Sequence, residues 1–125
     1  MKPQSLTNVA ALFLSASIAF AGVRVDPPSE ADKIAKLITH IREMKDTQFV
    51  RNGKAYDGNA AADHIQAKYD RVNDQIKTAR EFIEKCASKS ERSGDAYKIR
   101  FKDGTERTAS GYLNSQLDAI EKPAT

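Results

Sequence analysis

Residues 60–87, AAADHIQAKYDRVNDQIKTAREFIEKCA, carry apolar side chains four and three residues apart, the spacing typical of an amphipathic helix. One unbroken helix would be roughly 42 Å long at ~1.5 Å per residue. A compact domain of this size has a radius of gyration of only ~13 Å. We therefore expect a break or bend near residues 73–78, with a continuous helix as the alternative. The apolar positions are Ile65, Tyr69, Val72, Ile76, Ala79, Ile83 and Cys86.

Helix starts are marked by capping residues. Ser29 with Asp32 and Thr78 with Glu81 each have the spacing of a capping box, and Asn59 can cap the helix that follows it. The first helix is predicted at residues 30–45, and a last helix ends at 122–123. His40 falls off the apolar stripe of the first helix and is expected to be exposed. The last helix is anchored by Tyr112, Leu113, Leu117 and Ile120.

Two short segments read as hairpins rather than helices. Asn52-Gly53 follows Phe49-Val50 and is a strong two-residue turn signal. Farther on, apolar residues alternate with basic ones from Tyr97 to Phe101, the pattern of a half-buried strand, and residues 105–108 can return as its partner. The predicted fold is α+β and mainly helical, with about four helices around one core and one or two small β-hairpins.

The N-terminus predicts export. Lys2 precedes an uncharged run from Val9 to Phe20 that ends in small residues, which is the order of a cleavable signal peptide, and the run is too short to span a membrane. We expect a signal peptide at 1–21, a flexible lead-in at 22–28 and one small globular domain at 29–125. Gly22, not a cysteine, follows the cut at Ala21, so we do not expect a lipoprotein. Because the apolar run is too short to span a membrane, we expect no transmembrane anchor. In a Gram-negative host the compartment is the periplasm.

Composition narrows the class of protein. The 125 residues have a formal net charge of +3, a mildly basic mixture that does not indicate a nucleic-acid-binding protein. Cys86 is the single cysteine, so the core has to stabilise an exported chain without an internal disulfide. Cys86 has no spaced partner and the chain has two histidines, so we assign no metal ligands, no cofactor and no catalytic residues.

Four short motifs occur in order along the middle of the chain. They are Phe49-Val50-Arg51-Asn52-Gly53 with Tyr56, Ala62 with His64 and Lys68, Thr78-Ala79 with Phe82-Ile83, and Ser88-Lys89-Ser90 with Ser93-Gly94 and Tyr97. As a set they resemble a family of small exported proteobacterial proteins of unknown function. The resemblance extends from about Ile34 to Leu117. Tyr112-Leu113 stands where the family usually has a Trp-Leu pair, which preserves an aromatic anchor. The resemblance implies export and supplies no activity.

Two cationic groups are candidate binding sites. His64 and Lys68 share a helix face, and the hairpin can bring Arg51 near them to bind an anion. The alternative is structural: His64 hydrogen-bonds the hairpin backbone and the Lys68 stem covers the core edge. Lys98 and Arg100 project from one strand face as a docking stripe, or simply as a solvated edge. The binding candidates are Arg51, Asn52, Tyr56, His64, Lys68, Ser90, Lys98 and Arg100.

Three functions remain open. The leading hypothesis is a non-catalytic periplasmic binding or interaction module whose partner is an anionic envelope glycan, phosphate or an acidic protein. The second is a small envelope hydrolase in which His64 or Lys68 activates a serine of residues 88–93, which requires these groups within hydrogen-bond reach. The third is an inhibitor of a secreted enzyme, which shares the features of the first.

Overall fold

The computed structural model describes residues 27–122. The predicted signal peptide and all but the end of the lead-in lie outside these residues. The elements in chain order are α2 (Glu30–Arg42), β2 (Gln48–Arg51), β3 (Lys54–Tyr56), α3 (Gly58–Val72), the 3-10 turn η1 (Asn73–Gln75), α4 (Ala79–Cys86), β4 (Lys98–Arg100), β5 (Glu106–Thr108) and α5 (Ala109–Glu121). The α+β, mainly helical fold class is confirmed.

The two predicted hairpins join into one antiparallel sheet of four strands in the order β3-β2-β4-β5. The Asn52-Gly53 turn is confirmed, and both residues have a positive φ as a two-residue hairpin turn requires. The register pairs Phe49 with both Tyr56 and Ile99, so these three side chains share one face of the sheet.

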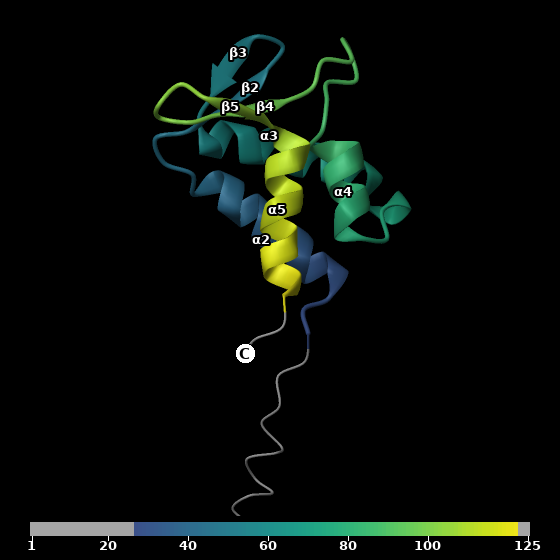
Figure 1. Ribbon diagram of the computed structural model, residues 1–125. Coiled ribbons are helices and arrows are strands. Elements are labelled where there is room, and N and C mark those ends of the chain that lie inside the picture. Colours follow the sequence, from purple (N-terminus) through teal and green to yellow (C-terminus); the bar gives the residue numbers. More distant parts are fainter. Residues whose placement is uncertain (1–26, 123–125) are drawn as a thin grey trace, which may run out of the picture.

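The helices lie against that face of the sheet, as Figure 1 shows. α3 contacts β2 and β3, α5 contacts β4 and β5, and α2 packs against both helices. α4 completes the helical layer beside α5 and α2. The start of α2 and the end of α5 lie together at the end of the molecule away from the sheet. The largest fully buried side chains are Tyr97, Phe49, Phe82, Leu37, Ile41, Ile65, Ile83, Ile99, Leu113 and Leu117.

Local capping explains where most helices begin. Both predicted capping boxes, Ser29 with Asp32 and Thr78 with Glu81, are present. The assignment of Asn59 as a cap was wrong, because Asp57 accepts the Ala60 amide at 2.8 Å and α3 begins two residues earlier than expected. An aspartate directly after the strand reaches the first free amides, whereas Asn59 is already inside the helix.

The predicted break between residues 73 and 78 is confirmed. α3 ends at Val72, η1 makes one tight turn, and the chain is extended at Ile76 before α4 starts. Ile76 is buried, so the break keeps this side chain in the core while the chain reverses. The Thr78 capping box then provides hydrogen bonds for the new N-terminus.

The first helix ends at Arg42, three residues before the predicted end. His40 is half-buried, not exposed as expected, because its Nε2 lies 2.8 Å from the Tyr112 hydroxyl. Tyr112 also packs edge-on against Phe101, with ring centroids 5.8 Å apart. The aromatic anchor predicted for the last helix therefore fastens α5 to both α2 and the β4 end of the sheet.

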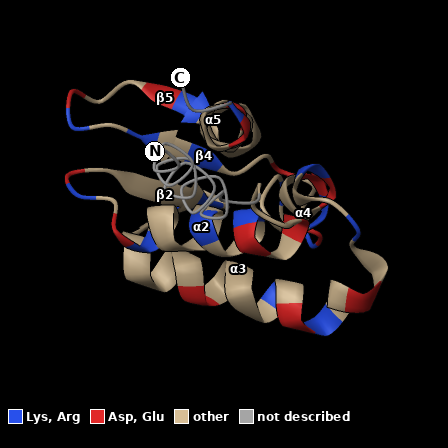
Figure 2. Cartoon of the chain, turned by 90° about the horizontal axis from the view of Figure 1, so that it is seen from below, with Lys and Arg blue, Asp and Glu red and all other residues tan. Residues whose placement is uncertain are grey.

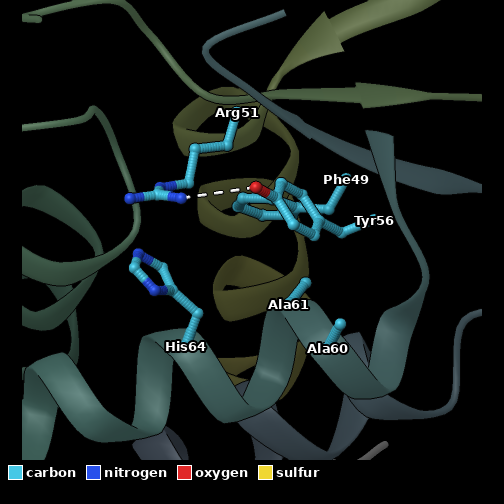
Figure 3. A pocket seen from close by; sticks show the side chains of 6 residues that line it. All are labelled: Phe49, Arg51, Tyr56, Ala60, Ala61 and His64. Carbon is cyan, nitrogen blue, oxygen red and sulfur yellow. Dashed lines mark hydrogen bonds between the residues drawn. The ribbon is translucent and has the colours of Figure 1, made fainter. Parts of the chain in front are cut away.

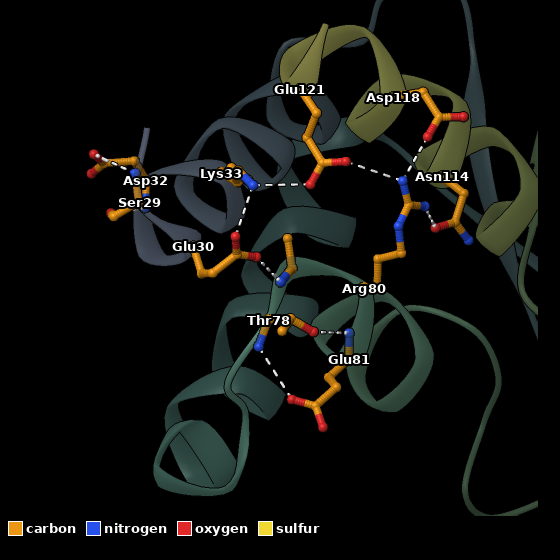
Figure 4. Close-up of polar contacts among 11 residues, drawn as sticks. Ser29, Glu30, Asp32, Lys33, Thr78, Arg80, Glu81, Asn114, Asp118 and Glu121 are labelled. Atoms are coloured by element: carbon orange, nitrogen blue, oxygen red, sulfur yellow. Dashed lines mark hydrogen bonds and ion pairs between the residues drawn. The ribbon is translucent and has the colours of Figure 1, made fainter. Parts of the chain in front are cut away.

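A polar network ties together the ends of three helices (Figure 4). Lys33 Nζ lies 2.7 Å from a Glu30 oxygen and 2.9 Å from a Glu121 oxygen, so it joins α2 to α5. Glu30 also accepts the Ala79 amide of α4 at 2.8 Å, and Arg80 pairs with both Glu121 and Asp118. Hydrogen bonds from Lys33 and from the Ala79 amide hold the pKa of Glu30 below its usual value. The network sets the relative positions of the three helix ends. It adds little to the free energy of folding, because most of its members are solvent-exposed.

None of the helices in the described part of the chain is both long and apolar enough to cross a membrane.

The end of α2 lies directly against Gly58, the first residue of α3. A Cβ at this position would lie 2.3 Å from the Ile41 carbonyl oxygen and 3.0 Å from the Arg42 carbonyl oxygen. Both neighbours are backbone atoms, which cannot move without shifting the end of α2. Only glycine fits between the two helices here.

We predict that Gly58→Ala destabilises the protein by about 1–3 kcal/mol, the cost typical of overpacking. At an unconstrained helical position the same change would stabilise by about 0.5–1 kcal/mol, so the sign of the effect is diagnostic. Urea denaturation followed by circular dichroism measures it. Asn59→Ala, at the exposed neighbouring position, is the control and should change stability by less than about 0.5 kcal/mol. A Gly58→Ala protein as stable as the wild type would contradict the close approach.

Candidate functional site: a cationic pocket under the first hairpin

A small pocket lies between the β2–β3 hairpin and the first turns of α3 (Figure 3). Its volume is about 90 Å³. This is far below the ~300–1,000 Å³ of sites that enclose a drug-sized ligand. The pocket therefore suits one chemical group. We call it the Arg51 pocket; it is lined by Phe49, Arg51, Tyr56, Ala60, Ala61 and His64.

The β2–β3 hairpin and α3 bring these side chains together. Phe49 and Tyr56 are directly paired across the hairpin, and Arg51, two residues after Phe49, points to the same face. On α3, His64 lies one turn after Ala60 and Ala61 and on the same side of the helix. The two alanines are short, so the hairpin and helix leave a space between them.

Arg51 contributes the permanent positive charge of the pocket. One of its terminal nitrogens donates to the Tyr56 hydroxyl at 3.4 Å. Its Nε is buried and has no hydrogen-bond partner within residues 27–122. A guanidinium has five N–H donors and stays protonated. Buried donors are normally hydrogen-bonded, so the Arg51 Nε–H is a donor that still lacks an acceptor in the described structure.

His64 faces Arg51 from α3 (Figure 3). Burial lowers the pKa of His64 below its ordinary value of 6.5, and the nearby positive charges of Arg51, Lys68 and Arg71 lower it further. The imidazole is therefore neutral near pH 7, with one nitrogen able to donate and the other to accept. Its Nε2 lies 3.5 Å from the Tyr97 hydroxyl, so the expected contact with the hairpin backbone is replaced by one with a core tyrosine.

Lys68 is buried next to Tyr97, with only 6% of its surface exposed. Its Nζ donates to the Tyr97 hydroxyl at 3.2 Å and to the Lys89 carbonyl at 3.3 Å, and lies 5.2 Å from the Tyr97 ring centroid. A lysine stem lying over the core edge was the structural expectation; the whole side chain is instead enclosed. Fully buried lysines are rare unless they are paired with an acid.

The basic side chains of this site have no carboxylate partner in the part of the chain that the structure describes. Among residues 27–122, none of the salt bridges involves Arg51, His64 or Lys68. Their contacts are tyrosine hydroxyls, a carbonyl oxygen and a π face, all of them neutral. The positive potential of the site is therefore not neutralised by the described part of the protein.

Asn52 and Ser90 lie close to the site but act as a structural link. Asn52 Nδ2 donates to Ser90 Oγ at 3.2 Å, and Ser93 Oγ donates to Asn52 Oδ1 at 2.6 Å, which ties the 88–96 loop to the hairpin turn. Ser90 is 2% exposed. The Ser90 hydroxyl forms no hydrogen bond with His64 or Lys68 in the described structure, so this serine lacks the nucleophile–base contact that the hydrolase hypothesis requires. The other serines of residues 88–93 also have local partners: Ser88 Oγ donates to the Ile83 carbonyl oxygen at 2.7 Å.

Lys98 and Arg100 belong to a different surface. The register pairs Lys98 with Val50 and Arg100 with Gln48, which places both on the sheet face opposite Phe49 and the pocket. Arg100 Nε is paired with Glu106 on the next strand at 2.8 Å. Basic and acidic residues are mixed over the helices and hairpin ends in Figure 2.

Tyr97 is the site residue that the sequence interpretation did not identify. Strand alternation predicted its burial correctly, and it is 1% exposed. Its hydroxyl nevertheless joins Lys68 to His64. The available signal was that Tyr97, like His64 and Lys68, belongs to one of the sequence motifs that resemble the family.

Residues 28–121 match the family of unknown function DUF5329. The chain belongs to this family. It is also similar to a protein of Salmonella typhimurium named "Uncharacterized protein YfeK", with 35% identity over 68 residues. That match covers 54% of this chain and 57% of the Salmonella protein, so the chain spans little more than half of this relative. No solved structure matches the chain.

The expected resemblance to a proteobacterial family of unknown function is thereby confirmed. The DUF5329 match contains every residue that lines the Arg51 pocket, together with Lys68 and Tyr97. Within residues 27–122, no three His, Cys, Asp or Glu side chains are grouped so that they could hold a metal ion. The donors of the Arg51 pocket suit an anion, because a cation would be repelled by Arg51.

We predict that Arg51→Met raises the pKa of His64, because it removes a positive charge that opposes protonation of the ring. An NMR titration of the His64 ring protons measures the change, and His40→Gln assigns the other histidine. The lowered pKa also has a consequence for stability. The unfolded chain binds its proton first as pH falls below about 6.5, so His64 lowers the free energy of unfolding as the solution is acidified. An unchanged or lower pKa in Arg51→Met would contradict the electrostatic coupling.

Proposed function

We propose that this protein is an exported, non-catalytic binding module that holds an anionic group in the Arg51 pocket. The observation that carries the proposal is that two cationic side chains, the half-buried Arg51 and the buried Lys68, form no salt bridge with a carboxylate among residues 27–122. An incoming anion would supply the missing counter-charge.

The donor geometry supports an anion over a neutral ligand. Arg51 lines the pocket together with Tyr56 and His64, and its buried Nε has no hydrogen-bond partner among residues 27–122. Charge-assisted hydrogen bonds from a guanidinium are roughly twice as strong as neutral ones. In a small, partly enclosed site they are also less weakened by water.

The wider setting of the proposal is the periplasm. The signal-peptide pattern at residues 1–21 supports export, and the ligand classes expected there are an anionic glycan, phosphate or an acidic protein. Lys98 and Arg100 lie on the opposite sheet face and would have to dock a partner independently of the pocket.

We predict that acetate or phosphate raises the melting temperature of the wild-type protein above its value in chloride at the same ionic strength. At a ligand concentration ten times Kd the gain is about 1.4 kcal/mol, which corresponds to several degrees for a domain of this size. Arg51→Met should abolish the gain, whereas the control Arg92→Met, at an exposed loop position, should keep it. Equal responses in the wild type and Arg51→Met would reject the pocket as the anion site.

We further predict that the native protein from a periplasmic extract begins at Gly22. N-terminal sequencing or intact mass measurement checks this. A chain that retains residues 1–21 and fractionates with cytosolic proteins would refute export, and it would leave the anion-binding experiment unaffected.

A further inference from the structure

We infer that the group bound in the Arg51 pocket is a carboxylate carried on a short apolar body. This inference rests on the proposed function and narrows it to one chemical class. It follows from three properties of the pocket: its division into a polar and an apolar side, its charge, and its volume.

The lining is divided into two chemically different sides. In Figure 3 the Arg51 guanidinium and the His64 ring lie together on one side, and the Ala60 and Ala61 methyl groups lie on the other. The Phe49 ring extends the apolar wall. A ligand that is charged throughout, such as inorganic phosphate, would leave the apolar side without a matching surface. A ligand with an anionic head and a hydrocarbon body matches both sides.

The charge of the lining favours a monoanion. Arg51 carries one permanent positive charge, and the lowered pKa of His64 leaves the imidazole neutral near pH 7. Lys68 does not line the pocket, and its Nζ donors are directed to Tyr97 and Lys89. The planar guanidinium fork matches a planar carboxylate through two parallel hydrogen bonds.

The volume limits the apolar body. A space of about 90 Å³ accommodates a carboxylate with a few carbon atoms and excludes a long acyl chain or a sugar ring system. Two sources have this chemistry. One is a free short-chain or branched carboxylic acid; the other is the C-terminal carboxylate of a peptide that ends in a small apolar residue.

NMR titration of the full purified protein with four probes tests the inference. The probes are isovalerate, acetate, inorganic phosphate and the neutral isostere isovaleramide. Isovalerate should bind about tenfold or more tightly than each of the others, because its buried hydrocarbon groups and its charge act together. The His64 and Arg51 signals should report the binding.

Ala60→Leu separates the apolar side from the charged side. The larger side chain at this exposed position should fill the apolar side of the pocket and remove the preference for isovalerate over acetate. Ala67→Leu is the matched control, the same change at an exposed position of α3 outside the pocket, and should keep the preference.

The outcomes distinguish this inference from the proposed function. If phosphate binds as tightly as isovalerate and Arg51→Met abolishes both, the carboxylate inference is wrong and anion binding stands. If no anion gives an Arg51-dependent response, both fail. Acetyl-Gly-Val with a free or an amidated C-terminus distinguishes the sources: tighter binding of the free acid than of isovalerate indicates a chain terminus, and binding of isovalerate alone indicates a free acid.

Discussion

The contact between Gly58 and the end of α2 is the constraint on which the arrangement of the molecule depends. With no side chain at Gly58, α3 begins directly against the Ile41 carbonyl, immediately after the hairpin has delivered the chain. Asp57 lies between β3 and α3 and caps the helix from this position. Hairpin and helix are therefore set at a short distance, and the Arg51 pocket is the space that remains between them.

The enclosed cations depend on the same packing. Burying an ammonium group is expensive unless polar partners replace its water. For Lys68 these partners are the Tyr97 hydroxyl and the Lys89 carbonyl oxygen. Tyr97 directly precedes β4, and Lys89 lies in the loop after α4. The Asn52–Ser90–Ser93 link holds that loop against the hairpin turn. The 88–93 segment, whose serines are the nucleophile candidates of the hydrolase hypothesis, thus helps to position the Lys89 carbonyl oxygen next to Lys68.

Local patterns predicted the elements well because their causes are local. The capping boxes at Ser29 and Thr78, the Asn52-Gly53 turn and the break after Val72 each depend on hydrogen bonds or sterics within a few residues. Two predictions failed for different reasons. The cap of α3 was misassigned locally, because Asp57 rather than Asn59 caps the helix. His40 is half-buried because Tyr112, 72 residues away in sequence, reaches it.

The sequence by itself determined the fold class, the starts of α2 and α4, the hairpin turn and the set of basic residues that includes Arg51, His64 and Lys68. Tertiary structure alone decided that the hairpins join through β2 and β4, that Tyr97 places its hydroxyl between Lys68 and His64, and that the Arg51 Nε is left without a partner. The physical reason is the distance along the sequence over which each interaction acts. Propensity and capping act within a helical turn, whereas burial, pairing register and charge compensation depend on which distant segments come into contact.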